Sequence, residues 1–154
     1  MNMTLQEILT EALEDEYKAR AMYRKVIDKF GPEQPFINIV EAEKRHISVL
    51  IPLFEKYNIP IPEDHWDSRL QAPDTLLKAC QAGVDAEIDN MTMYKRLLAA
   101  TVEPDVARIL SHLQAASRDN HLPAFQRCLE GGNGFGQRDR QKNIAGKRRR
   151  RHGQ

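Results

Sequence analysis

The sequence has only two cysteines, no long hydrophobic run and no segment that alternates apolar and polar residues. Cys80 and Cys128 are far apart and form no CxxC pair, so we expect reduced thiols on helices of a cytoplasmic protein. No stretch approaches the roughly 20 uninterrupted apolar residues of a membrane span, and residues 1–7 lack the basic start of a secretory signal. The missing alternation argues against β-strands. Together these absences favour an all-α protein without a membrane segment.

The small net charge of +1 conceals two segments of opposite sign. Residues 131–154 contain eight Lys and Arg against one Asp, a charge of +7, which leaves 15 basic and 21 acidic residues, a charge of −6, for residues 1–130. The basic segment is rich in glycine and arginine and poor in apolar residues, so we expect it to be disordered. Its run of five basic residues from Lys147 to Arg151 would bind polyanions such as nucleic acid, or it would only offset the acidic body.

Turn residues divide residues 1–130 into four helical segments. Thr4 and Glu7 form a capping-box pattern that starts the first segment, which is expected to end near residue 29, before Gly31. The others are expected at about residues 35–57, 75–100 and 104–131, with a proline-rich loop at residues 58–66. Apolar residues recur every three or four positions, which gives each helix one buried face. The sequence therefore predicts an antiparallel four-helix bundle over residues 1–130, followed by the basic tail.

Charged and polar side chains interrupt these buried faces near the middle of each helix. They are Glu16, Glu43, His46, Glu87 and His121. A buried carboxylate without a partner costs several kcal/mol, and three facing carboxylates would also repel one another. Protons, basic side chains or metal ions must therefore neutralise them, and divalent metal is the most economical, because several oxygens and imidazoles can share two cations. The nearby acidic residues are expected on the hydrated outer face: Glu14, Asp15 and Glu41.

Two tyrosines follow two of these glutamates at the same spacing. Tyr23 comes seven residues after Glu16, and Tyr94 comes seven residues after Glu87. Two helical turns place each phenol about 10 Å further along the same face. Tyr23 and Tyr94 are therefore candidates for assisting catalysis from beside the metal ligands, although buried tyrosines more often serve only as core aromatics.

These residues resemble the pattern of the ferritin-like di-iron carboxylate family, which includes rubrerythrins and bacterioferritins. That family takes one Glu from each of two helices and a Glu-x-x-His from each of the other two. Glu16 in EYKARAMY matches the first-helix glutamate, and Glu87 in AEIDNM matches that of the third helix. EKRH, from Glu43 to His46, matches one Glu-x-x-His. The segments FINIVEAEKRH and SRDNHL are similar to a narrower branch, the DUF2202 proteins.

The resemblance implies a centre of one or two iron ions, with manganese or zinc as alternatives. Glu43 would bridge the metals, and Glu16 and Glu87 would be terminal ligands. His46 and His121 would each anchor one metal. The resemblance further implies ferroxidase or peroxidase-type oxidation, with O2 or H2O2 as the small-molecule substrate, in a homo-oligomer that is a dimer or larger. Iron storage is a second class of function, and an interaction module with a structural bundle is a third.

One departure from the family pattern concerns the fourth helix. The residue three before His121 is Arg118, where a di-iron site would have a glutamate. One hypothesis is that the site still holds two metals, with water in place of the lost carboxylate. The other is that the Arg118 guanidinium pairs with Glu16 or Glu87 and leaves a single metal or none. A third alternative is that the site binds no metal. Buried ion pairs with Arg20, Arg45 or Arg118 would then neutralise the carboxylates.

Overall fold

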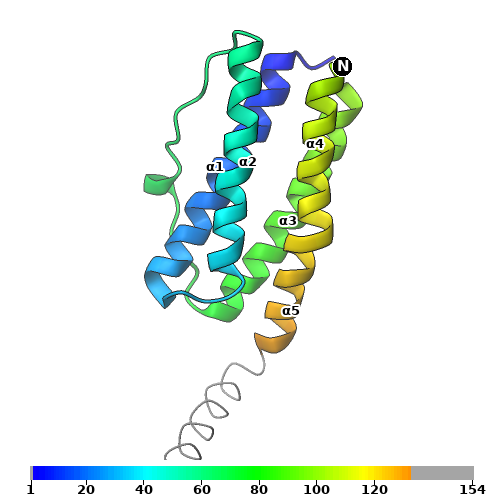
Figure 1. Cartoon of the computed structure of the whole chain (residues 1–154). Coiled ribbons are helices and arrows are strands. Elements are labelled where there is room, and N and C mark those ends of the chain that lie inside the picture. Colours follow the sequence, from blue (N-terminus) through cyan, green and yellow to red (C-terminus); the bar gives the residue numbers. More distant parts are fainter. Residues whose placement is uncertain (1, 133–154) are drawn as a thin grey trace, which may run out of the picture.

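Residues 2–132 are described by a computed structural model, and within that range every regular element is helical. The elements in chain order are α1 (Leu5–Phe30), α2 (Phe36–Lys56), the 3₁₀ helix η1 (Asp67–Arg69), α3 (Leu76–Ala100), α4 (Pro104–Ala116), the π-helical segment η2 (Ser117–His121) and α5 (Leu122–Gly132). α4, η2 and α5 follow one another without a break, so they form one long fourth helix (Figure 1).

The predicted all-α helical bundle is therefore confirmed. No helix within residues 2–132 combines the length and the apolar composition that crossing a membrane requires. Most of the predicted basic tail, including the run from Lys147 to Arg151 that would bind polyanions, lies outside the described residues.

Local sequence signals start and stop the helices. The Thr4 hydroxyl accepts a hydrogen bond from the Glu7 amide at 3.1 Å, and the Thr4 amide donates to the Glu7 carboxylate at 3.2 Å, which confirms the predicted capping box at α1. Gly31 follows α1 with a φ of 91°, a conformation that is much less costly for glycine than for a residue with a side chain. Pro104 occupies the first turn of α4, where its missing N–H costs no hydrogen bond. The helix ends thus depend mainly on neighbouring residues, which made them readable from the sequence.

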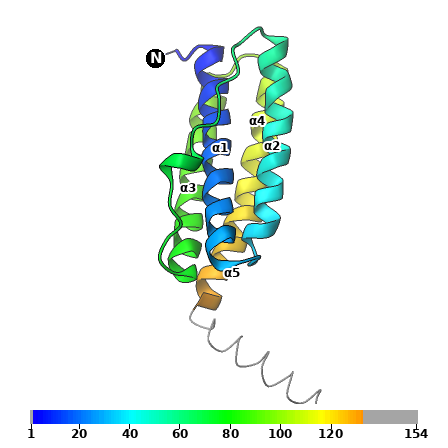
Figure 2. The same ribbon diagram turned by 90° about the vertical axis from the view of Figure 1, so that its left-hand side faces the viewer.

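Two helical hairpins and a long crossover build the bundle (Figures 1 and 2). α1 and α2 form the first hairpin, and α3 packs against the long helix of α4, η2 and α5 in the second. The crossover from α2 to α3, residues 57–75, runs along the length of the bundle beside α1. As a consequence, α2 and α3 run in the same direction, whereas α1 and α3 are antiparallel.

Polar contacts fasten the crossover to α1. The Trp66 indole N–H donates to Glu14 Oε2 at 2.7 Å, and Arg20 forms an ion pair with Asp64 at 3.0 Å. Glu14 is half-buried beneath the crossover, so its predicted place on the hydrated outer face is wrong. Since the guanidinium of Arg20 is turned toward the crossover, it is engaged on the outside of the bundle.

The interior consists of two hydrophobic clusters separated by a polar layer. The first cluster takes residues from the half of the bundle where α1 begins, among them Leu9, Leu50, Leu97 and Leu110. The second takes residues from the half where α1 ends, among them Tyr23, Phe36, Cys80 and Phe125. The polar layer between them contains the buried polar and charged side chains of residues 2–132, which are Glu16, Glu43, His46, Glu87, Asn90, Ser117 and His121.

A disulfide bond joins Cys80 of α3 to Cys128 of α5, with 5.7 Å between the two Cα atoms. Both residues lie in the second hydrophobic cluster. The prediction of two reduced thiols is therefore wrong. A sequence separation of 48 residues gave no sign of the pairing. The packing of α3 against α5 brings the two residues close enough for their sulfur atoms to bond.

Candidate metal centre

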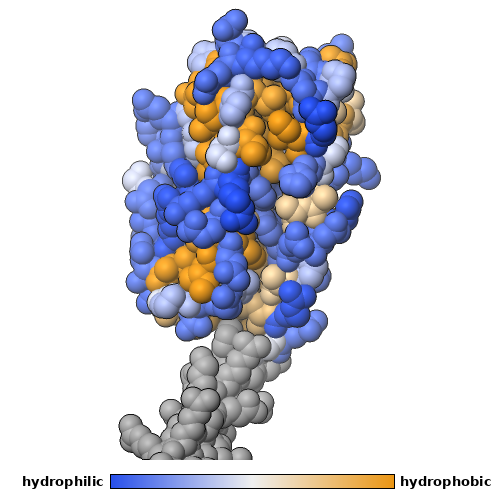
Figure 3. Space-filling model, viewed as in Figure 1, coloured by the Kyte–Doolittle hydropathy of each residue, from blue (hydrophilic) through white to orange (hydrophobic). Residues whose placement is uncertain are grey.

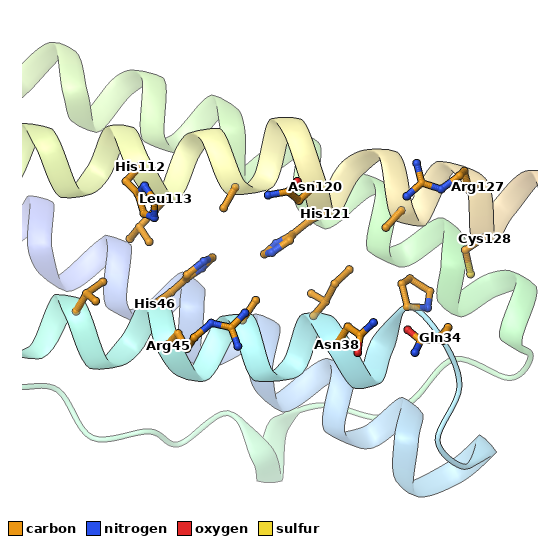
Figure 4. Close-up of a pocket in the computed structure, with 16 residues that line it drawn as sticks. Gln34, Asn38, Arg45, His46, His112, Leu113, Asn120, His121, Arg127 and Cys128 are labelled. Carbon is orange, nitrogen blue, oxygen red and sulfur yellow. The ribbon is translucent and has the colours of Figure 1, made fainter.

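The structure brings the five predicted ligand residues together in the polar layer. α1 supplies Glu16, α2 supplies Glu43 and His46, α3 supplies Glu87, and η2 supplies His121. Each of the five is between 1% and 8% exposed. The imidazoles of His46 and His121 point toward each other from α2 and η2 (Figure 4), with ring centroids 5.4 Å apart and ring planes 17° from parallel. Side chains that lie far apart in the sequence therefore converge on one buried volume.

Glu43 is shared between two groups of the same composition. In the first group, Nδ1 of His46 lies 3.2 Å from Glu16 Oε2 and 3.7 Å from Glu43 Oε2. In the second, Nδ1 of His121 lies 3.3 Å from Glu43 Oε1 and 3.4 Å from Glu87 Oε1. One donor atom per residue can be chosen in each group so that all lie within 4.8 Å of one another. Each group could hold a metal ion, and the two oxygens of Glu43 face different groups.

One ring nitrogen in the centre lacks a partner. Nδ1 of His121 is buried and makes no hydrogen bond to a described residue, although oxygens of Glu43 and Glu87 lie close to it. Leaving a buried polar atom unsatisfied costs about 1–3 kcal/mol, so this arrangement needs a reason. A metal ion held by the nitrogen and the two carboxylates would supply one, because imidazole nitrogen and carboxylate oxygen are both good ligands for divalent metals.

The two tyrosines reach across the bundle to the glutamates. The Tyr94 hydroxyl of α3 donates to Glu16 Oε1 at 2.6 Å, and the Tyr23 hydroxyl of α1 donates to Glu87 Oε1 at 3.1 Å. Each phenol thus contacts the glutamate of the other helix, because α1 and α3 are antiparallel. Burial, together with the charge of the glutamate that each contacts, raises the pKa of Tyr23 and of Tyr94 well above the usual value, so both remain hydrogen-bond donors. They hold the two carboxylates in place.

The arginines are directed away from the centre. Arg118 is exposed and pairs with Asp119 at 2.9 Å, so the hypothesis that it neutralises Glu16 or Glu87 is wrong. Arg20 pairs with Asp64, and Arg45 is exposed. Within residues 2–132, no Lys or Arg forms an ion pair with the three buried glutamates. Basic side chains of the described chain therefore do not neutralise the centre, which leaves protons or metal.

The π-helical segment η2 explains the outward direction of Arg118. A π turn contains more residues than an α turn, so Arg118, three positions before His121, lies further round the helix from it than it would in an α-helix, whereas Ser117, four positions before His121, stays on the buried face. The Leu122 amide donates to the Ser117 carbonyl across this wider turn. Pro123 follows directly and has no N–H to offer an α-helical bond. Counting in steps of three or four, which predicted the other ligand positions, could not reveal this change of register.

A chain of polar contacts beside the centre was missed by the sequence reasoning. The Ser117 hydroxyl donates to Asn90 Oδ1 at 2.6 Å, and the Asn90 amide donates to Asp15 Oδ2. Asp15 is half-buried, so its predicted place on the outer face is wrong, whereas Glu41 is exposed as predicted. Burial and the neighbouring charge of Glu16 raise the pKa of Asp15 to about 7. The signal available in the sequence was Asn90, a polar residue on the buried face of α3 three positions after Glu87.

Burial and hydrogen bonds shift the pKa values of the centre so that it retains protons. Burial lowers the pKa of His46, but its hydrogen bonds to Glu16 and Glu43 outweigh burial and raise that pKa to about 10. Burial likewise lowers the pKa of His121, but its contacts with Glu43 and Glu87 outweigh burial and raise that pKa to about 9. Burial and the charge of Glu43 raise the pKa of Glu16 to about 8. In the metal-free protein at neutral pH, protons on these groups therefore neutralise much of the buried charge.

The donor atoms restrict the metals that the centre could take. Carboxylate oxygens suit magnesium, calcium and manganese, and imidazole nitrogens suit iron, zinc, copper and nickel. A buried set of three carboxylates and two imidazoles without a thiolate combines both preferences. The residues present thus fit iron, and they also fit manganese or zinc.

Comparisons with known proteins agree with this fold. A family model described as "Uncharacterized protein domain (DUF2202)" matches residues 6–144. The uncharacterized protein MJ0754 of Methanocaldococcus jannaschii is 29% identical over 138 residues, covering 80% of this chain and 74% of the relative. The crystal structure of the hypothetical protein MJ0754 from Methanococcus jannaschii is similar with a TM-score of 0.76 at 25% identity, over 86% of this chain and 85% of that one. A hypothetical protein from Pyrococcus furiosus, with a TM-score of 0.67 at 20% identity over 84% of this chain and 90% of its own, supports the fold alone.

Proposed function

We propose that this chain, which belongs to the DUF2202 family, binds iron in its polar layer and takes part in O2- or peroxide-linked oxidation. Manganese or zinc would use the same donors. The observation that carries the proposal is the position of Glu43, whose two carboxylate oxygens face two buried groups of one glutamate and one histidine each. Two metal ions that shared Glu43 would neutralise the buried carboxylates and satisfy the unpaired nitrogen of His121.

The two groups of residues would each coordinate one ion. Glu16 and His46 would hold one ion, and Glu87 and His121 would hold the other. Burial opposes ionisation of Glu43, but its close contacts with Glu16, His121 and His46 lower the pKa of its carboxyl, so it stays anionic and suited to bridging. Bound iron would supply the redox chemistry that amino-acid side chains lack.

The remaining side chains would prepare the centre for that chemistry. Tyr94 and Tyr23 each donate a hydrogen bond to one oxygen of Glu16 or Glu87, which fixes the orientation of the carboxylate and leaves its second oxygen for a metal. The two hydrophobic clusters exclude water from above and below the polar layer. The open side is the one on which His46 and His121 border a cavity.

The order of the helices supports a place for this chain among the ferritin-like carboxylate proteins. Such bundles join two hairpins by a long crossover and draw their metal ligands from all four helices. Here α1, α2, α3 and η2 each contribute to the polar layer. The difference is that the fourth helix contributes Ser117 and His121 but no glutamate, so water would complete the coordination on that side.

Anaerobic titration of the full chain with Fe(II) tests the proposal. We expect two irons per chain, followed by a ferric absorbance when air or H2O2 is admitted. Glu43→Gln should lose at least one iron per chain, because it removes the shared charge. Glu41→Gln is the matched control, since Glu41 is exposed, lies two residues away on the same helix and is paired with Lys44 at 3.1 Å.

The possible stoichiometries separate the alternatives. One iron per chain would contradict the shared role of Glu43 and leave a mononuclear site. No binding of iron, manganese or zinc would contradict the metal centre altogether, and the bundle would then be a structural or interaction module. Equal loss of iron in the Glu41→Gln and Glu43→Gln chains would show that the effect is one of net charge rather than of coordination.

A further inference from the structure

A cavity of about 830 Å³ opens between α2 on one side and α4, η2 and α5 on the other (Figure 4). His46 and His121, both buried, are among the residues that line it, so the cavity borders the candidate metal centre. It is within the size range of small-molecule sites, which is about 300–1,000 Å³. Because Figure 4 shows both imidazoles between the facing helices, a molecule in this cavity would lie beside them.

The charge of the cavity is opposite to that of the bundle. Residues 1–130 carry a net charge of −6, yet none of the residues that line the cavity is Asp or Glu. Its lining instead includes Arg45, Arg127 and His112, all exposed, in addition to the two inner histidines. Neither Arg45 nor Arg127 forms an ion pair with a carboxylate of residues 2–132. Two guanidinium groups are therefore left for an anion from outside the described chain.

Part of the cavity wall is apolar, although Gln34, Asn38 and Asn120 also line the cavity. Ile39 and Ala42 of α2 line one side, and Ala116 and Ala124 line the other. Hydrophobic residues also gather on the surface that Figure 3 shows, separated by a band of hydrophilic ones. An inorganic anion would use the arginines and leave this wall in contact with water. The basic segment of residues 131–154, at +7, would be repelled by the arginines rather than bound.

We propose that the cavity binds a small organic carboxylate, with its apolar body against the Ala- and Ile-lined wall and its carboxylate on Arg45 or Arg127. Guanidinium groups bind carboxylates through paired hydrogen bonds, which fixes the orientation of the bound molecule. The apolar body gains free energy in proportion to the surface that it buries. Contact between the bound carboxylate and a metal ion rests on the proposed function. Binding of the carboxylate to the cavity does not.

Calorimetric titration of the full chain with octanoate tests the proposal, both without added metal and with Zn(II). We expect octanoate to bind at least about tenfold more tightly than 1-octanol or inorganic phosphate. The reason is that 1-octanol has no carboxylate for the arginines, and phosphate has no apolar body for the wall. The double variant R45Q/R127Q should weaken octanoate binding about tenfold or more. R108Q/R118Q is the matched control, because it removes the same charge from two exposed arginines that do not line the cavity.

The ring signals of the histidines locate the bound molecule. In NMR spectra of the full chain, octanoate should shift the imidazole signals of His46 and His121 and leave those of the exposed loop residue His65 unchanged. The proposal is overturned if both double variants weaken binding equally, if 1-octanol or phosphate binds as tightly as octanoate, or if no inner imidazole responds. Circular dichroism checks that the variants are folded. The iron stoichiometry of R45Q/R127Q is measured as well. If it is unchanged, a loss of octanoate binding is due to the arginines and not to damage to the metal centre.

Discussion

Metal binding to the polar layer should release protons, because the free centre holds them on groups that a metal would use. The pKa values of about 10 for His46, 9 for His121 and 8 for Glu16 mean that all three groups are largely protonated at pH 7. A ligand must be deprotonated to coordinate, so filling both groups should release about three protons per chain at pH 7. At pH 9 the same pKa values leave about one and a half protons to release.

Calorimetry with Zn(II), which has no redox chemistry, measures this number. Titrations at one pH in buffers of different ionisation enthalpy give the protons released per metal from the change in apparent heat. His121→Ala should reduce the release at pH 7 by about one proton and abolish one of the two binding events. Glu41→Gln should change neither value, since Glu41 is exposed on the outer side of α2.

A release close to zero at pH 7 would refute the reasoning. It would mean that the imidazoles and carboxylates of the metal-free centre carry no protons that a metal ion must displace. A release that stayed constant between pH 7 and pH 9 would contradict the raised pKa values of His121 and Glu16 in particular.

Three further predictions concern single features of the structure. Tyr94→Phe removes the hydrogen bond to Glu16 and should weaken metal affinity about 10- to 100-fold, measured against Tyr57→Phe, whose hydroxyl contacts Asp105 outside the polar layer; equal effects would contradict it. Reduction of the disulfide that closes a loop of 48 residues should lower the free energy of unfolding by about 4 kcal/mol, and an unchanged melting temperature with reductant would count against it. The raised pKa values of the two buried histidines mean that the metal-free chain binds protons on folding, so its stability from these groups is complete below about pH 6.5 and should be lost as pH rises through about 9–10, as denaturant titrations across that range would show.

Much of the fold and of the candidate site was predictable because it depends on local pattern. The capping box at Thr4 and the Gly31 stop involve residues close together in the chain, and they marked the ends of α1. The apolar spacing of three and four assigned one buried face to each helix. A charged residue on such a face is unfavourable without a partner, which is why Glu16 and Glu87 could be selected before their neighbours were known.

The sequence by itself thus determined the helices, the buried faces and the identity of five polar residues on them. Only the tertiary structure decided which of them meet. The antiparallel packing of α1 and α3 sent Tyr94 to Glu16 rather than along its own helix, and the approach of α3 and α5 paired the cysteines. The wider turn of η2 directed Arg118 outward, where it pairs with Asp119. These outcomes depend on how the helices pack against one another and on one change of helical register. The spacing of residues along the chain determines neither of them.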